Sequence, residues 1–247
     1  MSGALAVGDA PAAAFTVSFV ADDGKHEGSL SQLWGARFER VAPVRPVRAL
    51  RGRRNFAGLW WLACTGAHVG YESWLERDHL MGLDFDPAVV GVASQPFWLS
   101  WPSSGRSRRH APDFFARLRD GTGVVIDVRP DDRIAPADEA FAVTAQACES
   151  VGWEYRRVGV IDPVWATNVR WLAGYRHPRC FDAGRAAQLR EVLSAPLPLS
   201  VAARLVGDRL AVLPVLFHLL WTGVLVADLR SAPLAGDTVV GVAGGGR

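Results

Sequence analysis

Lysine is almost absent from this sequence. The chain has 247 residues and 27 basic side chains, of which Lys25 is the single lysine and the others are arginines. Schiff-base enzymes, phosphate-binding loops of the Walker type and protein kinases all need a lysine at a defined position. These mechanisms are therefore excluded unless they use Lys25.

Cysteine is also scarce. Cys64, Cys148 and Cys180 lie far apart and form no CxxC pair, which argues against a zinc site or a disulfide framework and favours reduced thiols. No basic segment followed by an apolar one marks a secretory signal, so we expect a cytoplasmic protein. The longest apolar run, Leu210–Val226, is shorter than the ~20 residues of a membrane span and contains Pro214. We interpret it as a buried helix followed by a strand.

What is present is the composition of a folded chain, with 49% hydrophobic and 21% charged residues. Strand and helix patterns alternate along the first part, which predicts an α/β fold with a mixed sheet. We expect strands at Phe15–Val20, Gly35–Arg40, Val89–Val92, 97–101, 112–119, 124–130 and Trp153–Val160, helices at Gly70–Met81 and 137–151, and a loop at 102–110.

The composition shifts near residue 178, which suggests domains at 1–178 and 179–247. In the second we expect helices at Phe181–Leu193, Ser200–Val206 (with Ser200 as a possible cap) and Arg209–Trp221, then strands at Gly223–Leu229 and Thr238–Val242. Two short helices followed by two strands predict a winged helix-turn-helix domain.

The hairpin around the DGTG turn is the informative feature. With the turn centred near residues 120–121, antiparallel partners sum to about 240, which places Asp113 opposite Asp127. Opposed side chains have Cβ atoms ~5 Å apart, so two carboxylates there repel each other unless a cation compensates. Oxygen ligands suit Mg²⁺ or Mn²⁺.

Arg129 falls on the same face as Asp127, because side chains alternate along a strand. A glutamate from the preceding helix would complete a site for metal-dependent phosphodiester hydrolysis. Two plainer readings stay open: Asp113 could cap a strand end, and Asp127 could simply pair with Arg129 or another arginine.

Several of these segments together resemble a known family. Pro112-Asp113 followed by Asp127-Val128-Arg129 is similar to the PD-(D/E)xK nuclease signature, with arginine in place of the usual lysine. The Ser73-Trp74-Leu75-Glu76 segment, the DFDP segment and Gln95-Pro96 extend the resemblance, over roughly residues 50–165, to the TnsA-like endonuclease subunit of heteromeric transposases.

The resemblance implies a restriction-endonuclease-like mixed sheet flanked by helices, with a small C-terminal winged-helix domain. It implies cleavage of the 5′ ends of a transposon in double-stranded DNA, beside a DDE transposase of the TnsB kind and an AAA+ regulator of the TnsC kind. Glu76, Asp113 and Asp127 would hold Mg²⁺ (or Mn²⁺), and Arg129 would occupy the lysine position. Glu72 lies one turn before Glu76, so helical periodicity alone does not choose between them.

Arginine at the lysine position changes the chemistry. An arginine side chain stays protonated in proteins, so Arg129 cannot act as a general base. It could orient water or stabilise phosphorane charge through its planar fork. The site is then either active without a basic side chain or weakened.

Two basic segments are candidates for phosphate contacts that position a duplex. They contain Arg45, Arg48, Arg51, Arg53 and Arg54 in the first and Arg106, Arg108 and Arg109 in the second. Gln95 would orient the glutamate helix, touch substrate or cap a turn. His110 lies three residues before Asp113 and could belong to a site with one metal and a histidine, but the favoured interpretation is a loop histidine without a role.

Two other functions remain open. The chain could be a catalytically inert DNA-binding or assembly subunit of the same complex, or a stand-alone restriction or repair nuclease. A nicking assay distinguishes the inert subunit from an active nuclease. Neighbouring genes distinguish a transposition subunit from a stand-alone nuclease.

Overall fold

The structure is a computed structural model that describes residues 14–45, 56–103, 105–130 and 138–244. The chain forms two compact units. The first contains the described residues up to Arg77 together with Ala88–Val160, and the second contains Asp78–Pro87 and the residues from Ile161 onward. Among the described residues, no helix is long and apolar enough to cross a membrane.

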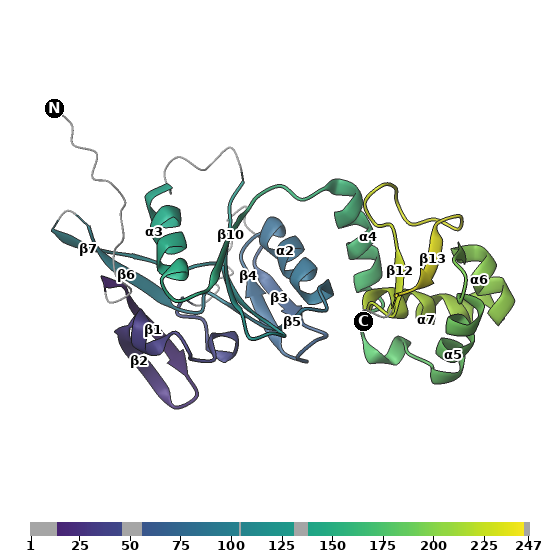
Figure 1. Ribbon diagram of the computed structural model, residues 1–247, viewed down its shortest axis with the longest axis horizontal. Coiled ribbons are helices and arrows are strands. Elements are labelled where there is room, and N and C mark those ends of the chain that lie inside the picture. Colours follow the sequence, from purple (N-terminus) through teal and green to yellow (C-terminus); the bar gives the residue numbers. More distant parts are fainter. Residues whose placement is uncertain (1–13, 46–55, 104, 131–137, 245–247) are drawn as a thin grey trace. The chain divides into compact units, whose positions relative to one another are not determined.

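The first unit is built on two four-stranded sheets (Figure 1). One has the order β2 (Gly24–Ser29), β1 (Thr16–Ala21), β6 (Trp98–Ser103), β7 (Arg106–His110). The other has the order β10 (Glu154–Val158), β9 (Gly123–Val128), β8 (Phe114–Leu118), β5 (Val89–Ser94). Strand β10 pairs parallel to β9 and the other neighbours are antiparallel, so the second sheet is mixed, as expected.

Smaller elements surround these sheets. They are the hairpin β3 (Gly58–Trp61) and β4 (His68–Tyr71), helices α1 (Leu30–Leu33) and α3 (Asp138–Glu149), and the 3₁₀ helix η2 (Phe38–Arg40). Helix α2 (Trp74–Phe85) begins in the first unit and continues into the second. The core of the first unit contains residues of both sheets and of α3, and fully buried Phe38 packs against Phe97, Phe115 and Trp153 near its centre.

The β8–β9 hairpin has the predicted register. Phe114 pairs with Ile126 and Phe115 with Val125, so partners sum to 240 and the next opposed pair is Asp113 and Asp127. Every residue of β9 is buried, and Asp127 is its only ionisable side chain. A continuous apolar run of this kind is typical of a strand covered on both faces.

The second unit combines helices with a small sheet. Its helices are α4 (Pro163–Ala173), η5 (Pro178–Cys180), α5 (Ala183–Val192), α6 (Leu199–Val206) and α7 (Arg209–Trp221). The sheet has the order β11 (Leu197–Pro198), β13 (Val239–Val242), β12 (Leu225–Ala227), all antiparallel. The apolar run thus forms a buried helix and a strand, as predicted.

Besides Asp78–Pro87, this unit contains the chain from Ile161 onward, whereas composition suggested a boundary near residue 178. The reason is that α4, which the sequence did not reveal, packs on α7. Its buried Asn168 also donates to the carbonyls of Leu229 (3.0 Å) and Ala232 (2.9 Å) and accepts from the N–H of Leu234 (2.7 Å). The side chain therefore ties α4 to the loop between β12 and β13.

Four local predictions were wrong. The segment 35–40 contains the 3₁₀ turn η2 instead of a strand, because a tight turn inserts Phe38 into the core. The helix expected from Gly70 begins at Trp74, since 68–71 pairs as β4. The expected loop 102–110 contains β7. Its polar side chains give no strand pattern in the sequence, and it forms a strand because it pairs with β6. Ser200 does not cap α6, which has Pro198 at the N-cap.

Candidate active site

The two aspartates of the hairpin lie side by side. Asp113 Oδ2 accepts the N–H of Val128 at 2.7 Å, which fixes this carboxylate against the end of β9. Burial, helped by the nearby carboxylates of Asp127 and Glu76, raises the pKa of Asp113 to about 7. The three predicted metal ligands therefore influence one another electrostatically in the folded chain.

Glu76 has a structural partner set at the start of α2. Its Oε2 accepts the N–H of Glu72 (2.7 Å) and its Oε1 accepts the hydroxyl of Ser73 (2.9 Å), while Ser73 Oγ accepts the N–H of Glu76 (3.1 Å). This is a capping-box arrangement, which satisfies N–H groups that a helix start leaves without partners. Burial raises the pKa of Glu76. The same S-x-x-E pattern thus explains the helix start and the family resemblance.

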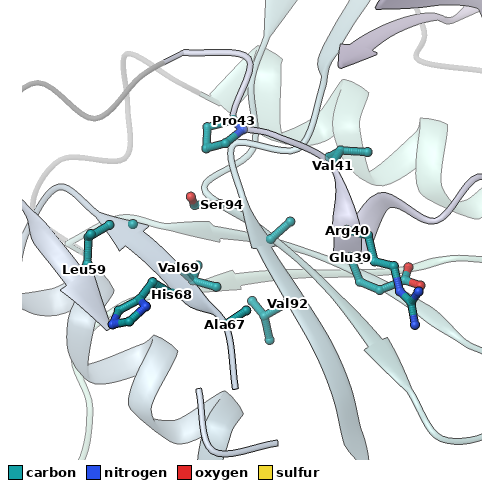
Figure 2. Close-up of a pocket in the computed structure, with 12 residues that line it drawn as sticks. Glu39, Arg40, Val41, Pro43, Leu59, Ala67, His68, Val69, Val92 and Ser94 are labelled. Atoms are coloured by element: carbon teal, nitrogen blue, oxygen red, sulfur yellow. The ribbon is translucent and has the colours of Figure 1, made fainter. Parts of the chain in front are cut away.

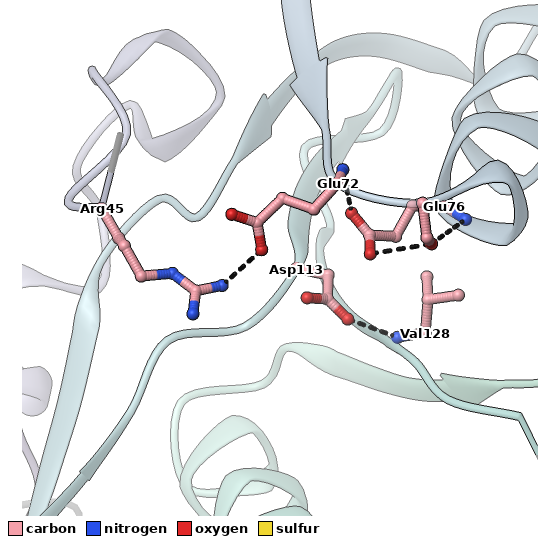
Figure 3. A network of polar contacts seen from close by, with 6 residues as sticks. Arg45, Glu72, Glu76, Asp113 and Val128 are labelled. Atoms are coloured by element: carbon pink, nitrogen blue, oxygen red, sulfur yellow. Dashed lines mark hydrogen bonds and ion pairs between the residues drawn. The ribbon is translucent and has the colours of Figure 1, made fainter. Parts of the chain in front are cut away.

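Glu72 points to a different partner. Its carboxylate forms an ion pair with Arg45 at 2.8 Å (Figure 3). Glu76 is one of the carboxylates that raise the pKa of Asp113, whereas the partner that the structure gives the Glu72 carboxylate is Arg45. The choice of Glu76 over Glu72 as the third carboxylate of the site stays a prediction.

Gln95 connects Arg45 to the backbone of Asp113. Its N–H donates to the Asp113 carbonyl at 2.9 Å, and with the amide oriented to satisfy its hydrogen bonds, the side chain bonds both the carbonyl and the guanidinium of Arg45. Gln95 is buried and has φ +44°, the only positive value at a non-glycine residue in the described part of the chain. Such strain costs about 1–3 kcal/mol and collects at functional sites. Gln95 therefore helps to fix the backbone at Asp113, next to the carboxylates of the site.

Asp127 is held by His110, which the sequence analysis favoured as a loop residue, and by Tyr155, which it did not name. His110 Nε2 lies 2.8 Å from Oδ1, and the hydroxyl of Tyr155 donates to Oδ2 at 2.9 Å. Burial and the negative charge of Asp127 raise the pKa of Tyr155. The interpretation of His110 as a loop histidine was wrong, because β7 ends at this residue and delivers its ring to β9. Only its place three residues before Asp113 was visible in the sequence.

Arg129 follows the end of β9. Its guanidinium lies 5.9 Å from the ring centre of Phe141 on α3, and its buried Nε has no hydrogen-bond partner among the described residues. The His110 ring also packs against Phe141, so Arg129 and the partners of Asp127 share one side of β9, as alternation predicted. Asp127 does not take Arg129 as its partner, which sets aside the simple ion-pair reading.

The predicted DNA-contacting arginines are in different situations. Arg48, Arg51, Arg53 and Arg54 lie outside the described residues. Arg106 is exposed on β7, and Arg109 lies over the ring of Trp98 with 4.2 Å to its centre. Arg108 pairs with Glu139 of α3 at 2.9 Å, and Arg45 pairs with Glu72. The exposed edge strand β7 thus presents Arg106 and Arg109 most openly.

The carboxylates fit a hard divalent cation by their chemistry. Asp113, Asp127 and Glu76 offer only oxygen atoms, and the raised pKa of Asp113 and Glu76 reflects buried charge that a cation would offset. In the described ranges, however, no three His, Cys, Asp or Glu side chains already form a metal-binding group. The carboxylate oxygens of Glu76 and Asp127 already accept hydrogen bonds from protein groups, so a metal would use their remaining lone pairs.

A separate hollow of about 540 Å³ lies in the first unit, bounded by the 39–43 segment, the β3–β4 hairpin and β5 (Figure 2). Val41, Val69 and Val92 give it apolar walls, and His68 and Arg40 lie at its border. The proposed metal ligands do not line it, so this hollow is distinct from the carboxylate site.

Comparison with known proteins gives one family. Residues 86–158 match the model of the TnsA-like endonuclease N-terminal family. The match contains Gln95, Asp113, Asp127 and Arg129, but it begins after α2 and ends before Ile161. No curated protein matches the chain significantly. The chain is thus similar to TnsA-like endonucleases over the segment that forms the mixed sheet and α3.

Proposed function

We propose that the chain is a metal-dependent DNA endonuclease subunit that cuts the 5′ ends of a transposon within a heteromeric transposase. The observation that supports it most is the buried carboxylate of Asp113, whose pKa is raised to about 7 by burial and by the nearby carboxylates of Asp127 and Glu76. Asp113 and Asp127 lie in a segment similar to TnsA-like endonucleases.

In this proposal each residue of the site has a specific role. Asp113 and Asp127 would hold Mg²⁺ or Mn²⁺, with Glu76 as the third ligand. A bound divalent ion would offset the carboxylate repulsion and make water a better nucleophile at neutral pH. Arg129, permanently charged, would stabilise negative charge on the phosphoryl group and would not accept a proton. Glu72, Arg45 and Gln95 would support the loop and helix around these groups.

The remaining surfaces supply DNA and protein contacts in this proposal. Arg106 and Arg109 of β7 would contact phosphates of double-stranded DNA, with the arginines at 48–54 as further contacts. The second unit would be a winged-helix domain, since α6, α7, β12 and β13 follow each other as that motif requires. Helix α7 has few charged residues, which favours protein contacts with a DDE transposase and an AAA+ regulator over reading a DNA groove.

A plasmid-nicking assay in Mg²⁺ or Mn²⁺ tests the function, with the protein alone and assembled with candidate transposase partners. We expect wild type to nick and Asp113→Ala to be inactive. Asp120→Ala, in the exposed turn of the same hairpin, is the matched control and should nick as wild type does. Equal inactivity of wild type and Asp113→Ala in the assembled complex would remove the nuclease proposal.

The alternative function is that of a subunit with the same fold but no nuclease activity. The absence of a preformed three-ligand group among the described residues, and arginine at the lysine position, favour an inert DNA-binding or assembly subunit. This alternative predicts DNA binding and complex assembly that Asp113→Ala does not change, together with no metal-dependent nicking.

A further inference from the structure

His110 and Tyr155 join three strands at one carboxylate. His110 is the last residue of β7, Asp127 lies in β9 and Tyr155 lies in β10. Strand β7 belongs to one four-stranded sheet, whereas β9 and β10 belong to the other. The contact between His110 and Asp127 at 2.8 Å is therefore a side-chain link between the two sheets of the first unit.

The two contacts occupy both oxygens of Asp127. This side chain is 2% exposed, and the hydroxyl of Tyr155 donates to its Oδ2. An ionised carboxylate only accepts hydrogen bonds, so with the His110 tautomer that carries the proton on Nε2, this N–H donates to Oδ1. Each carboxylate oxygen has two lone pairs, so one on each oxygen stays available. The carboxylate plane is thereby fixed, and its rotation is blocked from both sides.

The His110 ring is itself held in place. Phe141 of α3 packs edge-on against it, with ring centres 6.1 Å apart and an angle of 79° between the rings. Tyr155 is partly buried beside Cys148, also on α3. Both donors are therefore positioned by packing, which is the condition for a supporting group to orient a ligand accurately.

We propose that His110 and Tyr155 are positioning residues that orient the Asp127 carboxylate for metal binding. The inference rests on the proposed function, because it assumes that Asp127 binds the metal.

The test measures Mn²⁺ binding directly, by electron paramagnetic resonance of free Mn²⁺, beside the Mn²⁺ dependence of nicking. His110→Leu removes the donor, whereas His110→Gln keeps an N–H at similar reach. We expect His110→Leu to weaken Mn²⁺ binding by roughly 10- to 100-fold, the usual effect of losing such a partner. His110→Gln should stay within about threefold of wild type, and Tyr155→Phe should weaken binding in the same direction as His110→Leu.

Ser103→Ala is the matched control, because it removes another contact between the β6–β7 ribbon and α3, the 2.9 Å bond to Glu139. It should leave Mn²⁺ affinity unchanged. Thermal unfolding in EDTA reports any purely structural loss. Unchanged Mn²⁺ affinity in His110→Leu, or equal loss in His110→Leu and His110→Gln, would overturn the positioning role while wild-type nicking stands. A folded wild type that neither binds Mn²⁺ nor nicks would overturn both proposals.

Discussion

Replacing Asp113 by asparagine should stabilise the metal-free protein at neutral and alkaline pH. The pKa of Asp113 is raised from its ordinary 3.8 to about 7, so between these values the folded state binds a proton that the unfolded state has lost. Stability therefore falls as pH rises through this window, and deprotonated Asp113 is a cost above pH 7. Asparagine keeps an oxygen for the Val128 N–H but carries no charge.

The size of the effect follows from the shift. A change of about three pKa units at about 1.36 kcal/mol per unit sets an upper bound of about 4 kcal/mol. Urea unfolding in EDTA, followed by tryptophan fluorescence at several values between about pH 4 and about pH 8.5, measures it. The stability difference between Asp113→Asn and wild type should grow across this range and level off above the folded-state pKa.

Asp120→Asn is the control on the same hairpin. Hydrogen bonds from Thr122 lower the pKa of this exposed carboxyl, so its replacement should not stabilise the protein as pH rises. Adding Mg²⁺ should stabilise wild type, by about 2.7 kcal/mol at 100 times the dissociation constant, and not Asp113→Asn. If the free energy of unfolding changes with pH in parallel for wild type and Asp113→Asn, the reasoning is refuted, because the pKa of Asp113 is then not raised by burial and the neighbouring carboxylates.

Four further predictions concern single residues. Glu76→Gln should lower nicking roughly 100-fold and Glu72→Gln by less than about tenfold, since Glu76 is among the carboxylates that raise the pKa of Asp113 and Glu72 pairs with Arg45; equal losses would contradict this choice. Arg129→Lys should retain or raise nicking, whereas a strong loss would show that the planar guanidinium is required. Arg109→Ala should weaken DNA binding and reduce the slope of log affinity against log salt by about one, measured by fluorescence anisotropy. Asn168→Ala should destabilise the protein by roughly 2–4 kcal/mol in urea unfolding, because it leaves buried backbone groups of the β12–β13 loop unpaired.

Local patterns predicted a large part of the fold. Periodicity and turn residues placed the β8–β9 hairpin in its correct register, and with it the opposition of Asp113 and Asp127. They also placed α3, β10, α6 and α7 within a few residues. These elements are specified by neighbouring residues, through an Asp-Gly turn or a repeating apolar face, so a single sequence contains the signal.

Elements defined by distant contacts were missed. Strand β7 has polar side chains on both faces, and its strand partner is β6. Helix α4 was not recognised, and its membership in the second unit depends on Asn168, which bonds a loop more than 60 residues away. In both cases the stabilising partner is far along the chain, beyond the reach of local propensity.

The candidate site likewise has features that the sequence determines and features that depend on distant contacts. The sequence by itself determined its chemistry: three carboxylates, an arginine where lysine is usual, and no other lysine except Lys25, which lies in β2 and pairs with Glu27. Only the tertiary structure decided that Glu76 acts on Asp113 and which groups hold Asp127. His110 lies in β7 and Tyr155 in β10. No spacing in the sequence predicts that both contact Asp127, because these contacts depend on how the two sheets of the first unit pack against each other.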